Sequence, residues 1–368
     1  MPIVIMHIDD DEGDLNKFSK QFKKCEKDRL KIDYKKIKSS EILEDEQLFK
    51  KVKPDVILID FQFEKKKPKE PVLPFNGLTL SSHLRQIFPD TPMFLFSNPE
   101  LVESAESSRM NRIFDVTDDT IFKKNYLLPK EINKGIIFST IEGYKRLKTS
   151  KNNDFAGLYK ILGGPLSSKE DVYAIFPREA LDNQGQWAVF PIAKWIRKVL
   201  MEYPGILYDE IHAATFLGIS LNEFRNEKIQ EYFKNAQYSG PFSDQKNLWW
   251  KSELIGLSDK SMTEEEIFME FNKGFSQMWK RKTNESLKHA KCCFSGKTPA
   301  DYVCCILEKP VMVKYSLDYK KDDRPLIMDK PRVSFKAIQS TDKVKKDLID
   351  PSVFELYETV ISGKYVIE

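Results

Sequence analysis

Acidic, hydroxyl and amine side chains stand at the ends of several apolar segments in the N-terminal third of the chain. They are Asp9, Asp10 and Asp11 after "IVIMHI", Asp60 after "VILI", Ser97 at the end of "MFLFS" and Lys123 after "TIF". Carboxylates are the ligands that Mg²⁺ prefers, and an aspartate beside such an ion can act as the nucleophile toward a phosphoryl group. A hydroxyl and an ammonium group close by could bind the phosphoryl oxygens. Taken alone, Asp60 also fits a simple capping residue at a strand end.

These side chains can act together only if the fold gathers them. Apolar segments predict strands at 3–8, 30–37, 56–59, 93–97 and 120–122, and helical spacing predicts helices at 14–27, 41–51, 78–88, 100–110 and 129–147. Strands that alternate with helices favour an α/β fold with a doubly wound, five-stranded parallel sheet. Because the carboxyl ends of parallel strands meet at one edge, we expect the acids, Ser97 and Lys123 to share a pocket there.

This arrangement resembles the receiver domain of two-component response regulators. The resemblance covers residues 1 to about 147 and rests on the acidic run after the first strand, "VILID", "NGL" (76–78), "FLFS" and "DDTIFKK". It implies that Asp60 accepts a phosphoryl group and that Ser97 and Lys123 assist as catalytic residues. It also implies Mg²⁺ held by Asp9, Asp10, Asp60 and the Gln62 backbone carbonyl, with a histidine kinase or phosphotransfer protein as donor. We expect no enzymatic activity beyond phosphorylation and dephosphorylation of the receiver itself.

Three positions depart from the pattern of this family. The link from Asp60 to Asn76 is longer and contains "EKKKPKEP", Lys124 replaces the usual proline, and Thr120 stands where many receivers carry an aromatic residue. These departures leave open an alternative in which the chain is a receiver-like adaptor that is not phosphorylated, within a bacterial multi-protein conflict or defence system.

Length and charge set limits on the rest of the chain. The 368 residues predict two domains, which we place at 1–148 and 149–368 because the segment around 149–164 is polar and rich in glycine. A balance of 59 basic and 56 acidic residues gives no general argument for nucleic acid or an anionic membrane. No apolar run approaches the roughly 18 residues that span a bilayer. The acidic start differs from a signal peptide, so we expect a cytoplasmic protein without a membrane partner.

The second predicted domain is α+β, and its motifs do not indicate a family. It is predicted to be mainly helical to about residue 290, with helices at 187–201, 208–217, 221–236 and 263–288. Residues 292–340 are predicted to be rich in strands, in "DYVCCILE", "VMVKYSLDY" and "RVSFKAIQ". No catalytic motif is present, so we predict that this domain binds a protein partner, under the control of the receiver.

Two other interpretations of the second domain stay open. Residues 208–236 could form a helix-turn-helix that makes the chain a DNA-binding transcription regulator, although only Arg225 and Lys228 suit DNA and an ordinary helical hairpin is favoured. His289 and the cysteines Cys292, Cys293, Cys304 and Cys305 could ligate zinc. Adjacent cysteines in a strand point to opposite faces, so buried thiols are the favoured interpretation.

Overall fold

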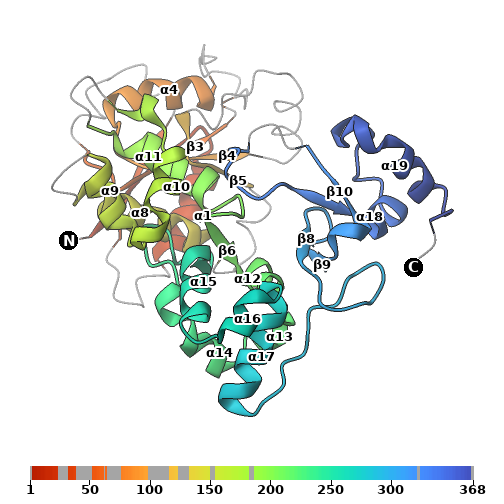
Figure 1. Ribbon diagram of the computed structural model, residues 1–368. Coiled ribbons are helices and arrows are strands. Elements are labelled where there is room, and N and C mark those ends of the chain that lie inside the picture. Colours follow the sequence, from red (N-terminus) through yellow and green to blue (C-terminus); the bar gives the residue numbers. More distant parts are fainter. Residues whose placement is uncertain are drawn as a thin grey trace. The chain divides into compact units, whose positions relative to one another are not determined.

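The chain forms two compact units, which comprise Met1–Asp154 with Glu179–Lys194, and Phe155–Arg178 with Trp195–Glu368 (Figure 1). This computed structural model describes residues 2–23, 32–38, 52–61, 63, 76–97, 116–122, 132–149, 154–181, 186–320 and 324–365. The boundary predicted between residues 148 and 149 stays a prediction, and the division into two units differs from it in the segment 179–194. That segment returns to the first unit, where Phe190 lies 3.7 Å below the Arg85 guanidinium and the Trp187 indole donates to the Asp154 carbonyl.

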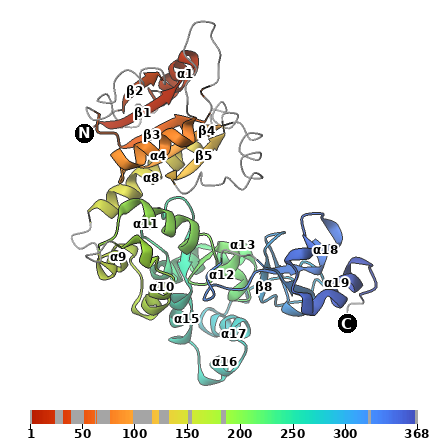
Figure 2. The ribbon, with the colours of Figure 1, turned by 90° about the horizontal axis from the view of Figure 1, so that it is seen from above.

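The first unit is built on a parallel sheet (Figure 2). Its body consists of β1 (Ile3–Asp9), β2 (Ile32–Lys38), β3 (Val56–Asp60) and β4 (Met93–Ser97), in the order β2-β1-β3-β4. The short β5 (Asp119–Phe122) pairs in parallel with β4 at the edge of the sheet. The sequence-based expectation of a doubly wound parallel sheet is therefore confirmed. The helices predicted at 41–51 and 100–110 lie outside the described residues.

Both faces of this sheet are covered by helices, which is why its strands read as continuous apolar runs. One face packs against α1 (Glu12–Lys23) and α8 (Ile132–Lys148) through Phe18, Phe22, Ile137 and Ile141. The other face packs against α4 (Gly77–Ile87) through Leu80 and Leu84. Alternate residues of each strand enter the two cores, so the strand carboxyl ends are held at one fixed edge.

The second unit begins with a helical region, whose elements are α9 (Phe155–Leu162), α10 (Lys169–Ala174), β6 (Leu207–Asp209), α12 (Glu210–Phe216), α13 (Leu221–Phe224), α14 (Glu227–Tyr232), β7 (Leu248–Trp250), α15 (Lys251–Asp259), α16 (Glu264–Phe268) and α17 (Phe271–Thr283). The helix α11 (Val189–Trp195), which belongs to the first unit up to Lys194, continues into a π-helical turn of the second unit, Ile196–Leu200, as predicted for 187–201. No described helix combines the length and the apolar composition that a bilayer crossing requires.

Two predicted long helices are each broken into two. The helix expected at 221–236 splits because Asn226 adopts an extended conformation and its side chain caps α14 by accepting from the Lys228 amide. The helix expected at 263–288 splits at Met269, and α16 and α17 then fold back on each other. Gly274 permits this close packing, since a Cβ there would lie 2.2 Å from the Glu266 carbonyl oxygen.

The C-terminal region contains a four-stranded sheet of short strands in the order β10-β11-β8-β9. They are β8 (Tyr302–Cys304), β9 (Lys309–Val311), β10 (Ser316–Asp318) and β11 (Arg332–Ser334), followed by α18 (Phe335–Ser340) and α19 (Phe354–Ile361). The stretch "RVSFKAIQ" is thus a strand only in its first half. Ser334 ends that strand and begins a helix, because its hydroxyl accepts from the Ala337 amide as an N-cap.

Candidate functional site at the edge of the parallel sheet

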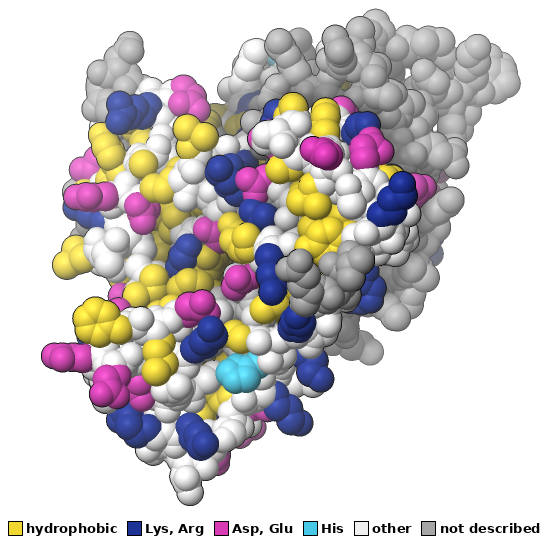
Figure 3. Space-filling model, turned by 45° about the vertical axis from the view of Figure 1, so that its right-hand side comes forward, with side chains coloured by type: hydrophobic (Ala, Val, Ile, Leu, Met, Phe, Trp, Pro, Cys, Tyr) yellow, Lys and Arg dark blue, Asp and Glu magenta, His cyan; other side chains and the backbone are white. Residues whose placement is uncertain are grey.

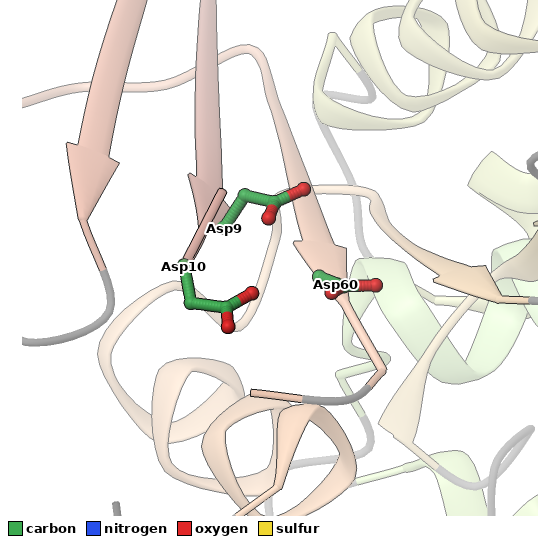
Figure 4. Close-up of side chains that lie close together, drawn as sticks. All are labelled: Asp9, Asp10 and Asp60. Carbon is green, nitrogen blue, oxygen red and sulfur yellow. The ribbon is translucent and has the colours of Figure 1, made fainter. Parts of the chain in front are cut away.

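Three carboxylates meet where β1 and β3 end. One carboxylate oxygen from each of Asp9, Asp10 and Asp60 lies within 4.8 Å of the others (Figure 4). Asp9 is completely buried, Asp60 is 4% exposed and Asp10 is half-buried. Like charges repel strongly at this distance in a partly desolvated site, and a divalent cation would offset that repulsion. The predicted meeting of these three side chains is therefore present, and the donor set fits a hard cation such as Mg²⁺.

Among the other predicted site residues, the structure describes the backbone of Ser97. Ser97 is the last residue of β4 and follows Phe96, which pairs with Asp60 of β3, and its side chain lies outside the described residues. Gln62 and Lys123 both lie outside the described residues as well. The roles predicted for Ser97, Lys123 and the Gln62 carbonyl stay predictions.

The three consecutive aspartates at the end of β1, Asp9 to Asp11, have two different roles. Asp9 accepts a hydrogen bond at Oδ1 from the Asp11 amide, at 2.8 Å, which tightens the turn that leads into α1. Asp11 accepts at Oδ1 from the amides of Gly13 and Asp14, at 2.7 and 3.3 Å. Asp11 thus satisfies the first amides of α1 in the manner of an N-cap. Asp9 and Asp10 are left as the pair that faces Asp60.

The "NGL" motif positions Asp60 through its backbone. A Cβ on Gly77 would lie 2.0 Å from the Asp60 carbonyl oxygen, so only glycine allows α4 to begin this close to β3. The Gly77 amide donates to the Phe61 carbonyl at 3.0 Å. Asn76 caps the helix by accepting from the Thr79 amide at 2.9 Å. The motif therefore fixes the strand end that presents the Asp60 carboxylate.

A histidine beside the cluster was missed by sequence reasoning. His7 is completely buried in β1, its Nδ1 lies 2.5 Å from the Tyr34 hydroxyl, and its Nε2 lies 3.7 Å from Asp9 Oδ2. Burial and the negative charge of Asp9 raise the pKa of Tyr34. The sequence did contain a signal for this contact, since His7 is the one polar residue in the apolar run "IVIMHI". An ionisable side chain in a buried strand requires a polar partner.

The cysteine-rich segment shows no metal centre among the described residues. The three aspartates at the sheet edge form the one cluster there with suitable spacing for a metal, and all four cysteines are free thiols. Cys304 Sγ accepts from the Ser334 amide and Cys292 Sγ from the Met312 amide. His289 instead interacts with the Gly218 carbonyl at 3.0 Å. Cys292 and Cys304 are buried, as the favoured interpretation expects, whereas Cys293 is half-buried and Cys305 is exposed.

The segment proposed as a helix-turn-helix offers little to DNA. Its expected recognition helix is the four-residue α13, and its two basic side chains are paired with acids, Arg225 with Glu210 and Lys228 with Glu285. Figure 3 shows one face of the molecule, on which basic and acidic side chains are intermixed. A DNA contact relies on cations that are available to phosphates, and these two are already engaged.

Comparisons with known proteins find similarity in solved structures. No protein-family model and no curated protein sequence matches the chain. Solved structures match its N-terminal part, among them a response regulator receiver domain protein from Clostridium thermocellum, 13% identical, covering 40% of this chain and 99% of the other with a TM-score of 0.29. A signal receiver domain from Bacteroides fragilis is 18% identical over 34% and 86% of the chains, with a TM-score of 0.24. An adenylate cyclase from Rhodopirellula baltica is 16% identical over 40% and 94%, with a TM-score of 0.29.

These identities and scores are low, so the class of the first unit rests on its own strand order and site. A parallel sheet in the order β2-β1-β3-β4, with acids after β1 and an aspartate at the end of β3, defines a receiver-like domain. The second unit is not assigned to a class.

Proposed function

We propose that the first unit is a receiver that accepts a phosphoryl group on Asp60 with the help of Mg²⁺ and thereby regulates the binding of a protein partner by the second unit. The observation that carries the proposal is the meeting of three carboxylates, two of them almost fully buried, at the carboxyl edge of the parallel sheet. Buried acids gathered at such an edge are uncommon in a purely structural role, because their charges raise the energy of the folded state.

The chemistry would be a phosphoryl transfer in line with the Asp60 carboxylate. An Asp60 oxygen attacks phosphorus, the bond from phosphorus to the donor nitrogen of a phosphohistidine breaks, and its electron pair stays on that nitrogen. A bound Mg²⁺ would neutralise charge on the phosphoryl oxygens and orient them. Asp9 and Asp10 would hold the ion on one side while β3 and Gly77 fix Asp60 on the other. Ser97 and Lys123 are the proposed partners of the remaining phosphoryl oxygens.

The proposed output is a change of surface rather than a second reaction. A phosphoryl group adds nearly two negative charges at one edge of the sheet, and such a change biases a two-state surface when its interactions differ between the states. We infer a place in a phosphorelay, with a histidine kinase or a phosphotransfer protein as donor and a protein as the partner of the second unit.

The test uses the full chain with Mg²⁺ and acetyl phosphate, read out by intact mass. We expect incorporation of one phosphoryl group that requires Mg²⁺, and its complete loss in Asp60→Asn. The matched control is Asp33→Asn, an exposed acid on β2 that pairs with Lys35 and should leave incorporation unchanged. Equal behaviour of wild type and Asp60→Asn would overturn the proposal and favour an adaptor that is not phosphorylated.

A further inference from the structure

The second unit contains a cavity of about 560 Å³ that the proposed receiver chemistry does not use. It is lined by residues of β6, α12 and β8 and by the segment 324–331. The Asp329 amide donates to the Pro204 carbonyl at 2.9 Å, and Gly205 approaches Met328 so closely that a Cβ there would lie 2.8 Å from its Cα. These contacts hold the walls together without a ligand. The volume lies within the range of small-molecule sites.

Two polar pairs stiffen the walls of this cavity. Asp329 accepts from the Tyr208 hydroxyl at 2.5 Å and from Lys251 at 3.1 Å. Asp209 accepts from His212 at 2.7 Å and pairs with Lys246 at 3.1 Å. In each case the negative charge of an aspartate is balanced by the positive charge of a lysine, so these four charges interact with one another within the protein. They shape the cavity and leave recognition to other residues.

Thr215 presents a hydroxyl that lacks a partner in the described structure. It is 1% exposed, lines the cavity, and its Oγ1 forms no hydrogen bond. Two other helical threonines donate to the carbonyl four residues before them, Thr283 at 2.8 Å and Thr359 at 2.9 Å. Thr215 departs from that pattern although it sits in a helix. Because its Oγ1 has almost no accessible surface, a ligand in the cavity does not reach this hydroxyl, and recognition depends on other residues of the lining.

Arg324 is one of these other lining residues. Its Nη1 donates to the carbonyls of Pro325 and Met328, which fixes the side chain, while its Nε is buried without a partner in the described structure and the residue lines the cavity. A guanidinium presents its donors in a planar fork that matches a carboxylate. The Nε has almost no accessible surface, so a ligand carboxylate would bond with Nη2, which no hydrogen bond of the described structure engages.

The charges that remain around the cavity have both signs. Besides Arg324, the lining contains the exposed ammonium of Lys330 and three exposed carboxylates, those of Glu202, Asp301 and Glu308. A plain anion would be repelled by these carboxylates, and a plain cation would leave the Arg324 guanidinium unsatisfied. A molecule with one charge of each sign complements both.

We propose that this cavity binds a small zwitterion of the amino-acid type, either a free amino acid or a short peptide. Its carboxylate is held by Arg324, and its ammonium faces the acidic rim. The proposal does not depend on phosphorylation of the first unit.

The test measures binding to the full chain by calorimetry, with the twenty free amino acids and a set of dipeptides as probes. We expect at least one probe to bind with a Kd below about 1 mM, and its N-acetyl and carboxamide derivatives to bind at least about tenfold more weakly. A panel without a binder, or N-acetyl and amide derivatives that bind as well as the zwitterion, overturns the proposal.

Variants then tie the binding to this cavity. Arg324→Gln should weaken binding at least about tenfold, the worth of one hydrogen bond to a charged group. The matched control, Thr215→Val, changes a lining residue whose hydroxyl a ligand does not reach, and it should leave the affinity unchanged. Affinity that survives Arg324→Gln would contradict the proposal. If that variant fails to fold, the comparison of each probe with its carboxamide on the wild-type protein still decides, because only the acid can bond with Arg324 as a carboxylate.

Discussion

The acidic cluster of the first unit and the cavity of the second unit use charged side chains in opposite ways. At the sheet edge, three charges of one sign are brought together by two strand ends, and the arrangement fits a cation and a reacting phosphoryl group. In the cavity, aspartates are paired with lysines, and the walls become rigid. The comparison teaches that like charges held close together form a site for an ion of opposite charge, whereas opposite charges paired with each other form the rigid walls of a cavity.

The largest effect is expected from Gly77→Ala, which should damage the first site only. The new Cβ would lie 2.0 Å from the Asp60 carbonyl oxygen, so the backbone must move. We expect a loss of about 3 kcal/mol in unfolding free energy and a marked loss of phosphoryl incorporation. Gly135→Ala in α8 is the control, because a Cβ there meets nothing within 4 Å, and it should stabilise by about 0.5–1 kcal/mol. Urea denaturation of both variants measures this, and equal effects would contradict the role assigned to Gly77.

Addition of Mg²⁺ should distinguish the regions next. An ion that binds the folded cluster stabilises it by about 2.7 kcal/mol at a concentration one hundred times its Kd. Asp10→Asn removes one of the three ligands and should raise the Mg²⁺ concentration needed for the same shift in melting temperature. The cavity variant Thr215→Val should respond to Mg²⁺ as wild type does. Stabilisation that persists unchanged in Asp10→Asn would place the ion elsewhere.

Acid should affect the cavity wall through Asp209. Burial opposes ionisation of this carboxylate, but its hydrogen bond with His212 and the charge of Lys246 outweigh burial and hold its pKa below the ordinary value of 3.8. A lowered pKa in the folded state means that Asp209 stabilises the fold above pH 3.8, and that this contribution is lost progressively as the pH falls from 3.8 toward the lowered pKa. Denaturation midpoints from pH 5 to pH 2 test this, and His212→Asn should make the decline shallower. An identical decline in that variant would refute the assignment.

The smallest effect compares two helix caps. Asn76→Ala and Ser334→Ala each remove a side chain that accepts from a helix amide, and each should cost about 1 kcal/mol of stability. Only Asn76→Ala should also slow phosphoryl incorporation, because α4 begins against Asp60. Asn76→Asp keeps the cap and should restore both properties. A slower reaction in Ser334→Ala as well would show that the readout follows general stability.

Much of the first unit could be predicted because its pattern is local and its topology is restrictive. Buried strands such as "VILI" and "MFLF" are apolar on both faces, and parallel strands bring their carboxyl ends to one edge without further information. Asp9, Asp10 and Asp60 were therefore predicted to meet. The contact of His7 with Tyr34 was not, because the pairing of β1 with β2 and the depth of both side chains become visible only after packing.

The second unit was harder to predict for an equally physical reason. A helical period continues unchanged through Asn226 and Met269, so the breaks there depend on caps and on helices that fold back, not on periodicity. In "RVSFKAIQ", β-branched and apolar residues favour a strand, yet the hydrogen bond from the Ala337 amide to Ser334 begins a helix. Short elements gain most of their stability from tertiary packing, which overrides weak local preference.

By itself, the amino-acid sequence determined the parallel sheet, the edge where its acids meet and the identity of the candidate phosphoryl acceptor, because alternation of strands and helices leaves few ways to connect them. Only the tertiary structure decided which acid caps a helix, that Gly77 abuts the Asp60 backbone, and that Thr215 and Arg324 line one cavity. Those facts depend on contacts between residues far apart in the chain, such as the 121 positions that separate Tyr208 from Asp329. No local pattern encodes such a distance, since it follows from how whole elements pack.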